Sequence, residues 1–459
     1  MWFIDIAEDL ENELDSEKEL RLLWTCPPEM CPETARIGGC SSQSLQPGLG
    51  CKGELSKMKR IMKLSKHKLV ILMLMGTICL ILPVHSRADK KPEEVEIPQS
   101  IYPGLHHFFD LVDPEKNISF DPGLVARVMK FIEEPKNDDT LYFADGVLGM
   151  PSAYHEFDSH ADLRKITEYA FNPDIPGIAT MPSSVRLIHW MDAKGQRRKT
   201  PRVERYLGDL DTPVVEKTMQ YVEITPDTNS GAYYGYNLHQ TLIVFKYRQR
   251  KVLISLSRQA DVSSVGKKGY VLGKDEDWDY FYSNKEGLTI PALGWVSSYI
   301  YGSGAINIYY EIDPRSPKVR CAMFKWLRDG WSGINMVQRK HIYKGLKRFA
   351  RPFKEIIEYP SLPPVEVLAS DFSQIRKFSD DALRAKMDIY SNILKRRYIG
   401  DNHSGKKWLP KLLADKDHWS GMSRDEMESA LVIEYMKAVI GKTPVADIEE
   451  LLEFKTVKQ

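Results

Sequence analysis

Two histidines and a carboxylate lie within six residues of one another, in the segment His155-Glu-Phe-Asp158-Ser-His160. Imidazole and carboxylate groups are ligands that Zn²⁺ binds readily in proteins. A strand would place Asp158 and His160 on one face and His155 on the other, whereas a helix would bring only His155 and Asp158 together. Only a loop would bring all three side chains to one point. The segment is therefore a zinc-site hypothesis, and its alternative is a solvated polar loop.

Four carboxylates further along the chain follow part of a calcium-loop pattern. Asp275, Asp277, Asp279 and Glu286 occupy positions 1, 3, 5 and 12 of that pattern. Tyr280 stands at the sixth position, where the sharp turn of such a loop requires Gly, and the flanking sequence has strand rather than helix character. We therefore do not expect a calcium site here.

The motifs that could supply a nucleophile are incomplete. The segment from Gly330 to Gly333 is one residue short of G-x-S-x-G, and it lies between predicted helices rather than after a strand. Cys321 has basic neighbours, but we expect it on the apolar face of a helix, where a buried thiol is inert. Because these motifs are incomplete, a binding protein is favoured over an enzyme. They do not indicate which reaction an enzyme would catalyse.

A basic stretch followed by an apolar run begins near Met58. Five Lys and Arg residues precede the uncharged run at 69–84, and small residues follow at Ser86 and Ala88. This is the pattern of an export signal. Residues 58–88 are thus either a cleaved signal, with 1–57 a gene-model extension, or a membrane anchor with 1–57 as a cytoplasmic tail. Both interpretations place the remaining chain outside the cytoplasm, in the periplasm or secreted.

Charge and cysteine content exclude two classes of protein. The chain has 64 Lys and Arg against 63 Asp and Glu, a balance that argues against a general nucleic-acid binder. Five of the six cysteines precede residue 80, which leaves Cys321 alone in the exported part. The exported part therefore has no internal disulfide, and its fold must depend on a hydrophobic core.

Strand and helix patterns divide the exported part into segments. A charged, Pro-containing tether at 89–103 precedes an N-terminal helical segment at 104–150, a sheet-plus-helix domain at 151–360 and a helical C-terminal extension at 361–459. Helical periodicity is expected at 123–132 and 162–170. Strands are expected at 184–191, 217–224, 240–247 and 252–257, and a hairpin is expected with strands 295–301 and 305–312 around the turn Gly302-Ser303-Gly304.

Helices follow Pro317 in the sequence. A short helix is predicted from Val319, Met323 and Leu327, and a longer one from the apolar stripe between Ile342 and Ile356, which Pro352 should kink or divide. A further helix is expected at 371–396. The last helix is predicted to begin at a capping box, Ser423 to Glu426, and to end before Gly441.

The order of these elements resembles a known family. Trp295 on one predicted strand, Tyr310 near the end of the next, the segment Lys325-Trp-Leu and the long helix with Gly345-Leu346 resemble the C-terminal half of START-type (helix-grip) lipid-binding domains, over residues 246–358. The resemblance implies an α+β fold in which a curled antiparallel sheet packs on a long C-terminal helix and leaves an apolar cavity. It provides no catalytic residues to carry over.

The resemblance implies that particular side chains line the cavity. The candidates are Trp295, Tyr299, Ile306, Ile308, Tyr310, Leu346, Phe349 and Phe353. Two other uses of the same residues stay open: a close-packed core without a cavity, which is the usual state of protein interiors, and an exposed aromatic strip that binds glycan.

We therefore expect an exported protein that binds a lipid or other apolar ligand. The basic run between Arg339 and Arg351 could contact an anionic membrane surface, and nucleic acid is not an expected partner. Two alternatives are a metal-assisted hydrolase with zinc at His155, Asp158 and His160, and a cell-envelope interaction protein whose protein partner is unknown. No other cofactor is expected.

Overall fold

The computed structural model describes residues 92–192, 194–198, 202–208, 210–290, 294–313, 315–400 and 421–453. The predicted leader and export signal, residues 1–88, lie outside the described residues. Within the described residues, no helix is both long enough and apolar enough to cross a membrane. From Pro92 onwards, the described residues belong to one unit.

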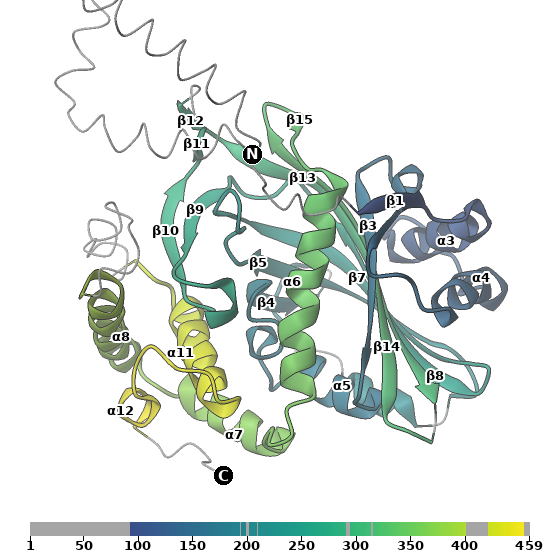
Figure 1. The fold of residues 1–459 in the computed structure, drawn as a ribbon. Coiled ribbons are helices and arrows are strands. Elements are labelled where there is room, and N and C mark those ends of the chain that lie inside the picture. The colour runs from purple at the N-terminus through teal and green to yellow at the C-terminus, as the bar shows by residue number, and fades with distance from the viewer. Residues whose placement is uncertain are drawn as a thin grey trace, which may run out of the picture. The chain divides into compact units, whose positions relative to one another are not determined.

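Ten strands of the described chain form one sheet in the order β1-β2-β3-β14-β13-β8-β7-β5-β4, with the short β15 added to β14 (Figure 1). β1 pairs with β2 in parallel, and the other neighbours in the sheet are antiparallel. The strands are β1 (Glu93–Glu96), β2 (Thr140–Phe143), β3 (Ser152–Ser159), β4 (Val185–Met191), β5 (Val214–Ile224), β7 (Gly235–Tyr247), β8 (Arg250–Gln259), β13 (Ser298–Asp313), β14 (Lys318–Trp331) and β15 (Ile334–Asn335).

Two smaller sheets accompany the large one. The first has the order β10-β9-β6, and the second is the pair β11 and β12. Their strands are β6 (Ala232–Tyr233), β9 (Lys267–Val271), β10 (Tyr280–Glu286), β11 (Leu288–Ile290) and β12 (Gly294–Val296).

Helices cover both faces of the large sheet. α3 and α4 pack on one face, whereas α6 crosses the other, with the C-terminal helices on the same side as α6 (Figure 1). The predicted α+β class is confirmed. The α-helices are α3 (Tyr102–Val112), α4 (Pro122–Glu133), α5 (Leu163–Ala170), α6 (Arg339–Ile357), α7 (Val365–Arg376), α8 (Asp380–Gly400), α11 (Arg424–Val439) and α12 (Ile448–Leu452), and the 3-10 helices are η2 (Gln99–Ile101), η3 (Asp145–Val147), η4 (Gly177–Ala179), η5 (Val203–Leu207) and η6 (Asp275–Asp277).

The face of the sheet that α3 and α4 cover, called the α3 face below, is densely packed. Phe109 of α3 meets Trp326 of β14 edge to face, with ring centroids 5.1 Å apart. The indole N–H of Trp326 donates to the carbonyl of Ala144 over 2.8 Å, so that this buried polar group is satisfied. Apolar side chains of the central strands complete this core, among them Ile254, Leu256, Ile306, Ile308, Tyr310 and Phe324.

The predicted hairpin around Gly302-Ser303-Gly304 is wrong. β13 runs without interruption through these residues, and its register with β14 shifts between Ile300 and Gly302, which marks a bulge. A Cβ atom on Gly304 would lie 2.6 Å from Cδ1 of Leu148, so the residue lets the segment after η3 approach the strand closely. These glycines therefore serve the strand and its packing, not a turn.

The short helix predicted from Val319, Met323 and Leu327 is also wrong. These residues belong to β14, a central strand with α3 and α4 on one side and α6 on the other. Between Arg320 and Lys325 this strand is apolar without interruption, because both of its faces are buried there. Periodicity alone cannot distinguish such a run from a buried helix.

Other predicted elements are confirmed. The pattern at 123–132 is α4, that at 162–170 is α5, and the capping box at Ser423 starts α11. The pattern at 371–396 is divided between α7 and α8, since the chain leaves helical geometry between Arg376 and Asp380. The segment expected to be a tether holds β1, η2 and the start of α3.

Candidate ligand-binding site

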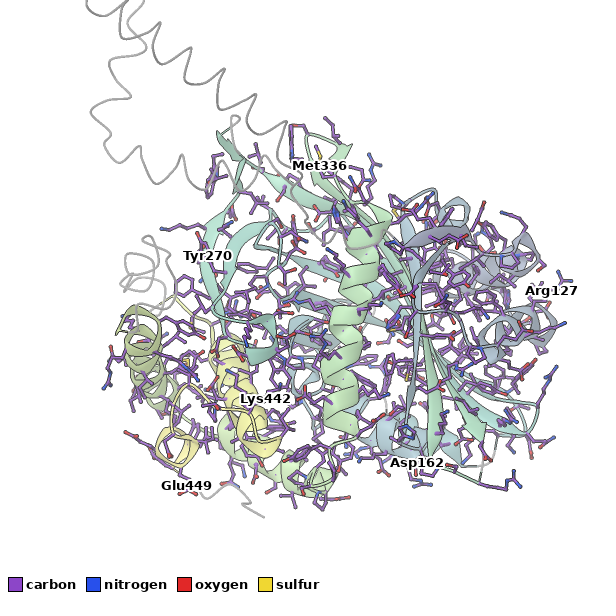
Figure 2. All side chains as sticks on the ribbon, viewed as in Figure 1. Arg127, Asp162, Tyr270, Met336, Lys442 and Glu449 are labelled. Carbon is purple, nitrogen blue, oxygen red and sulfur yellow. The ribbon has the colours of Figure 1, made fainter. Side chains whose placement is uncertain are left out.

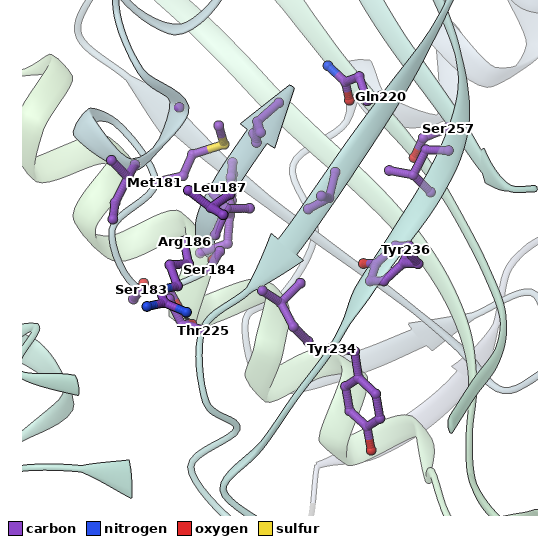
Figure 3. Close-up of a pocket in the computed structure, with 18 of the residues that line it drawn as sticks. Met181, Ser183, Ser184, Arg186, Leu187, Gln220, Thr225, Tyr234, Tyr236 and Ser257 are labelled. Atoms are coloured by element: carbon purple, nitrogen blue, oxygen red, sulfur yellow. Dashed lines mark hydrogen bonds between the residues drawn. The ribbon is translucent and has the colours of Figure 1, made fainter. Parts of the chain in front are cut away.

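A cavity of about 800 Å³ lies between the sheet, α6 and the segment around η4. This volume falls within the range of about 300 to 1,000 Å³ that is usual for small-molecule sites. Figure 3 shows Gln220, Tyr236 and Ser257 on one side of the cavity and Met181 and Leu187 on the other. The sheet contributes Gln220, Val222, Tyr236, Leu238, Gln240, Ser255, Ser257, Ala305, Asn307, Tyr309, Met323 and Lys325, and α6 contributes Ile342, Leu346, Phe349 and Phe353.

Short side chains at the centre of the sheet create the space. On the face toward α6, called the cavity face below, β8 carries Ser255 and Ser257, and β13 carries Ala305 and Asn307. Ala305 is paired with Ser257, and Asn307 with Ser255, so the four residues form one patch. Side chains of this size leave the cavity face open, whereas the Ile and Leu residues on the α3 face of the same strands are buried in one apolar core.

The distribution of apolar clusters reflects this difference. The buried apolar residues of the α3 face that the structure describes form one continuous cluster. Those of the cavity face belong to three clusters, which lie around the cavity. The first includes the C-terminal half of α6 and the C-terminal helices, and the second includes residues of β4, β5 and β7. The third includes the N-terminal half of α6 and residues of β3. The cavity thus interrupts an otherwise apolar interior.

Helix α6 provides the aromatic wall. Phe349 and Phe353 stack with ring centroids 5.4 Å apart, and Phe353 also lies 6.2 Å from the ring of Tyr309 on β13. Leu346 is on the same face of the helix, one turn earlier. These side chains present an apolar surface opposite the small residues of the sheet.

A few polar groups stand on this apolar lining. The side-chain amide of Gln240 donates to the hydroxyl of Ser255 over 2.7 Å, and the ammonium of Lys325 donates to the hydroxyl of Ser303 over 2.6 Å. Burial lowers the pKa of Lys325 to about 8, because desolvation disfavours its charged form. A mainly apolar pocket with a small number of polar groups is the usual design of a site that orients an amphiphilic ligand.

A carboxyl group lies farther along β14 toward its end. The phenol of Tyr234 donates over 3.1 Å to Asp329, and it shares a second contact of 3.1 Å with the hydroxyl of Ser298. All three residues line the cavity. Burial raises the pKa of Asp329 to about 7, although the hydrogen bond from Tyr234 acts in the opposite direction.

The candidate lining residues fall into three groups. Leu346, Phe349 and Phe353 line the cavity. Ile306, Ile308 and Tyr310 lie on the α3 face, in the core with α3 and α4. The remaining two lie toward the end of the sheet: Trp295, on β12, has 57% of its surface exposed, and Tyr299, near the start of β13, contacts Tyr301 with ring centroids 6.1 Å apart.

The three candidate zinc ligands are not brought together. β3 sends His155 toward α6, where its ring meets Tyr343 with centroids 5.7 Å apart, and burial lowers the pKa of His155 to about 4. Asp158 points to the α3 face, where Arg320 and Lys318 bind it over 2.8 and 3.0 Å. His160 follows the end of the strand. Among the described residues, no group of three or more His, Cys, Asp or Glu side chains is placed to hold a metal ion.

The other motifs of the sequence have structural roles. Asp275 binds the guanidinium of Arg348 through two hydrogen bonds of 2.7 and 2.8 Å, and Asp279 is paired with the buried Lys437. Cys321 is buried on β14, and desolvation raises the pKa of its thiol far above the ordinary value, which makes it unreactive.

The sequence analysis missed the polar floor of the cavity. Ser255, Ser257 and Asn307 alternate with large apolar residues on two adjacent strands, and this alternation was the available signal. Comparison of the chain with protein-family models, with curated proteins and with solved structures found no match.

Proposed function

We propose that this protein binds a lipid or a similar apolar small molecule in the cavity between the sheet and α6, outside the cytoplasm. The observation that carries the proposal is the cavity itself, with about 800 Å³ of space and a mainly apolar lining. Close packing is the rule in protein interiors, so a space of this size is expected to hold a ligand.

The arrangement of the strands supports a helix-grip interpretation of the fold. Seven antiparallel strands lie side by side in the order β3-β14-β13-β8-β7-β5-β4. Along the chain β3 is the first of these strands and β14 the last, yet the two are neighbours in the sheet. α6 follows after the short β15 and lies across the cavity face, against β3 and β14 at one edge of the cavity. A sheet that curls away from the helix beyond this contact would enclose the space between them.

We further propose that an anionic membrane surface is the source of the ligand. The outer face of α6 exposes Lys340, Lys344, Lys347 and Arg351 at three- and four-residue steps. Ile334 and Met336, which are exposed, lie just before this helix at the end of the sheet where β12 carries Trp295 (Figures 1 and 2). Exposed apolar side chains beside basic ones are the combination that binds lipid headgroups and the outer acyl region.

Native mass spectrometry of the purified full-length chain, followed by organic extraction and metal analysis, tests the proposed function. We expect one apolar molecule per chain, which is released when the protein is denatured. A chain that carries zinc but no extractable ligand would contradict the proposal and support the hydrolase alternative. A chain that carries neither, and that binds no added lipid, would contradict it in favour of an interaction protein.

A further inference from the structure

Lys325 is a cation inside the cavity without a carboxylate partner. It projects from β14 onto the cavity face, and within the described residues its one hydrogen-bond partner is the hydroxyl of Ser303. No salt bridge joins it to any described carboxylate, and desolvation alone accounts for the shift of its pKa. A buried charge without a counter-charge is costly, so such groups are normally paired.

The other buried and partly buried cations of the lining are neutralised. Arg186 binds Glu223 and Glu426 over 2.8 and 2.6 Å, and Arg348 binds Asp275. These ion pairs leave Lys325 as the partly buried cation of the described lining that still lacks a negative partner. The cavity therefore offers one positive charge at one place.

The surroundings of Lys325 leave room for a ligand atom. Ala305, its direct neighbour on β13, has only a methyl group, and Ser257 on β8 follows on the other side of Ala305. Asn307 stands two residues further along β13 on the same face. The hydroxyl of Ser257 and the amide of Asn307 make no hydrogen bond to any described group. Three polar groups thus lie around the methyl group of Ala305 on the floor of the cavity.

We infer that the ligand carries one carboxylate, which binds the ammonium of Lys325 beside Asn307 and Ser257, while its apolar chain lies along Leu346, Phe349 and Phe353. This inference rests on the proposed function. A carboxylate has a single charge that matches one lysine, whereas a phosphate monoester has a charge of about −1.5 to −2 at neutral pH and would need a second cation. The ligand class is therefore an amphiphile with one negative charge, of which a long-chain carboxylic acid of fatty-acid type is the simplest.

Binding of palmitate and of hexadecanol to the delipidated full-length chain tests the inference. The two probes share an apolar chain, and only palmitate carries the carboxylate. Lys325→Met keeps the length of the side chain and removes its charge. We expect this variant to bind palmitate about 10- to 100-fold more weakly than the wild type, which corresponds to the loss of one charge-assisted hydrogen bond. Its affinity for hexadecanol should change less than about threefold, since the apolar lining is intact.

Two controls keep the outcomes separate. Lys130→Met removes a charge from the exposed face of α4, on the other side of the sheet, and should leave both affinities unchanged. Hexadecanol binding by Lys325→Met shows that the variant is folded and that its cavity is open. Two results would overturn the carboxylate inference while the cavity proposal stands. In the first, Lys325→Met binds hexadecanol and also keeps its affinity for palmitate. In the second, the wild type binds hexadecyl phosphate more tightly than palmitate. If the wild type binds none of the three probes, the proposed function itself fails.

Discussion

The hydroxyl of Ser183 donates a hydrogen bond of 2.8 Å to the backbone carbonyl of Arg348. In an uninterrupted helix this carbonyl would accept from the N–H of residue 352, but Pro352 has no N–H. The serine thus replaces the missing donor, and α6 continues through Pro352 to Ile357. Because Ser183 and Arg348 both line the cavity, the same bond fixes the helix to the part of the cavity wall between η4 and β4.

Replacement of Ser183 by Ala should lower the free energy of unfolding by about 1 to 3 kcal/mol, because the carbonyl of Arg348 then loses its donor. The loss should be smaller when Pro352 is also replaced by Ala, since the new N–H can bond the same carbonyl. Denaturant unfolding of the two single variants and the double variant measures this coupling. Equal losses from Ser183→Ala in both backgrounds would show that the hydroxyl does not compensate for the proline.

Replacement of Ser257 by Phe should fill the centre of the cavity. We expect at least a tenfold loss of apolar-ligand binding, measured by displacement of a fluorescent fatty acid, because the new ring occupies the space of the ligand chain. Val215→Phe is the matched control: it adds a ring on an adjacent part of the sheet, but its position is partly exposed and outside the cavity. Unchanged binding by a folded Ser257→Phe variant would argue that the ligand lies elsewhere.

The sequence alone was sufficient to predict those elements whose signals lie within a few neighbouring residues. The capping box of Ser423 and Glu426 forms as expected: the backbone N–H of Ser423 donates to Glu426 over 2.7 Å, and the backbone N–H of Glu426 donates to Ser423 over 3.4 Å. The apolar stripe of α6 likewise predicted both its position and its buried face. Such signals involve residues within one or two turns, so they can be interpreted without knowledge of the tertiary structure.

The orientation of β13 could not be predicted in this way. Alternation separates Ile306, Ile308 and Tyr310 from Ala305 and Asn307, but it does not say which set faces the cavity. The resemblance to a lipid-binding fold implies an apolar cavity and therefore favours the apolar set. The structure places that set in the dense core with α3 and α4, and places the small and polar residues at the cavity. Space arises where side chains are too short to fill it, and this depends on the distance to α6, which no local pattern contains.

Ionisation of Asp329 should make the protein less stable as the pH rises. In the unfolded chain an Asp ionises near pH 3.9, whereas burial raises the folded-state pKa of Asp329 to about 7. Between these values the folded state keeps a proton that the unfolded state has lost, so the free energy of unfolding decreases with pH until about pH 7. Asp329→Asn keeps the shape and removes this effect.

Unfolding free energies of wild type and Asp329→Asn between pH 4 and 8 give the measurement. As the pH rises over this range, the free energy of unfolding of the variant should increase relative to that of the wild type by on the order of 1 kcal/mol or more. The change should be complete slightly above pH 7. Asp261→Asn, at an exposed position, is the control and should show no such trend. A constant difference between Asp329→Asn and the wild type would mean that Asp329 is ionised throughout.

Removal of two charges from the outer face of α6 should weaken membrane binding. Lys340 and Lys344 are exposed and make no ion pair with a described residue, so their charges are free to meet lipid headgroups. Near an anionic surface each lysine contributes about 1 kcal/mol, so Lys340→Gln with Lys344→Gln should reduce binding to vesicles of anionic lipid about 30-fold. Cosedimentation of the wild type and the double variant with these vesicles, at low salt and at 0.5 M salt, measures the affinities. The difference in affinity between the two proteins should vanish at high salt because the charges are screened.

A variant with the same change in net charge separates a local site from a general attraction. Arg127 and Lys130 are exposed on α4, on the opposite side of the sheet from α6 (Figure 2). Replacement of both by Gln alters the net charge equally and should leave vesicle binding within about twofold of the wild type. If the two double variants lose the same affinity, the attraction follows the net charge of the whole protein, and α6 is not the membrane-facing element.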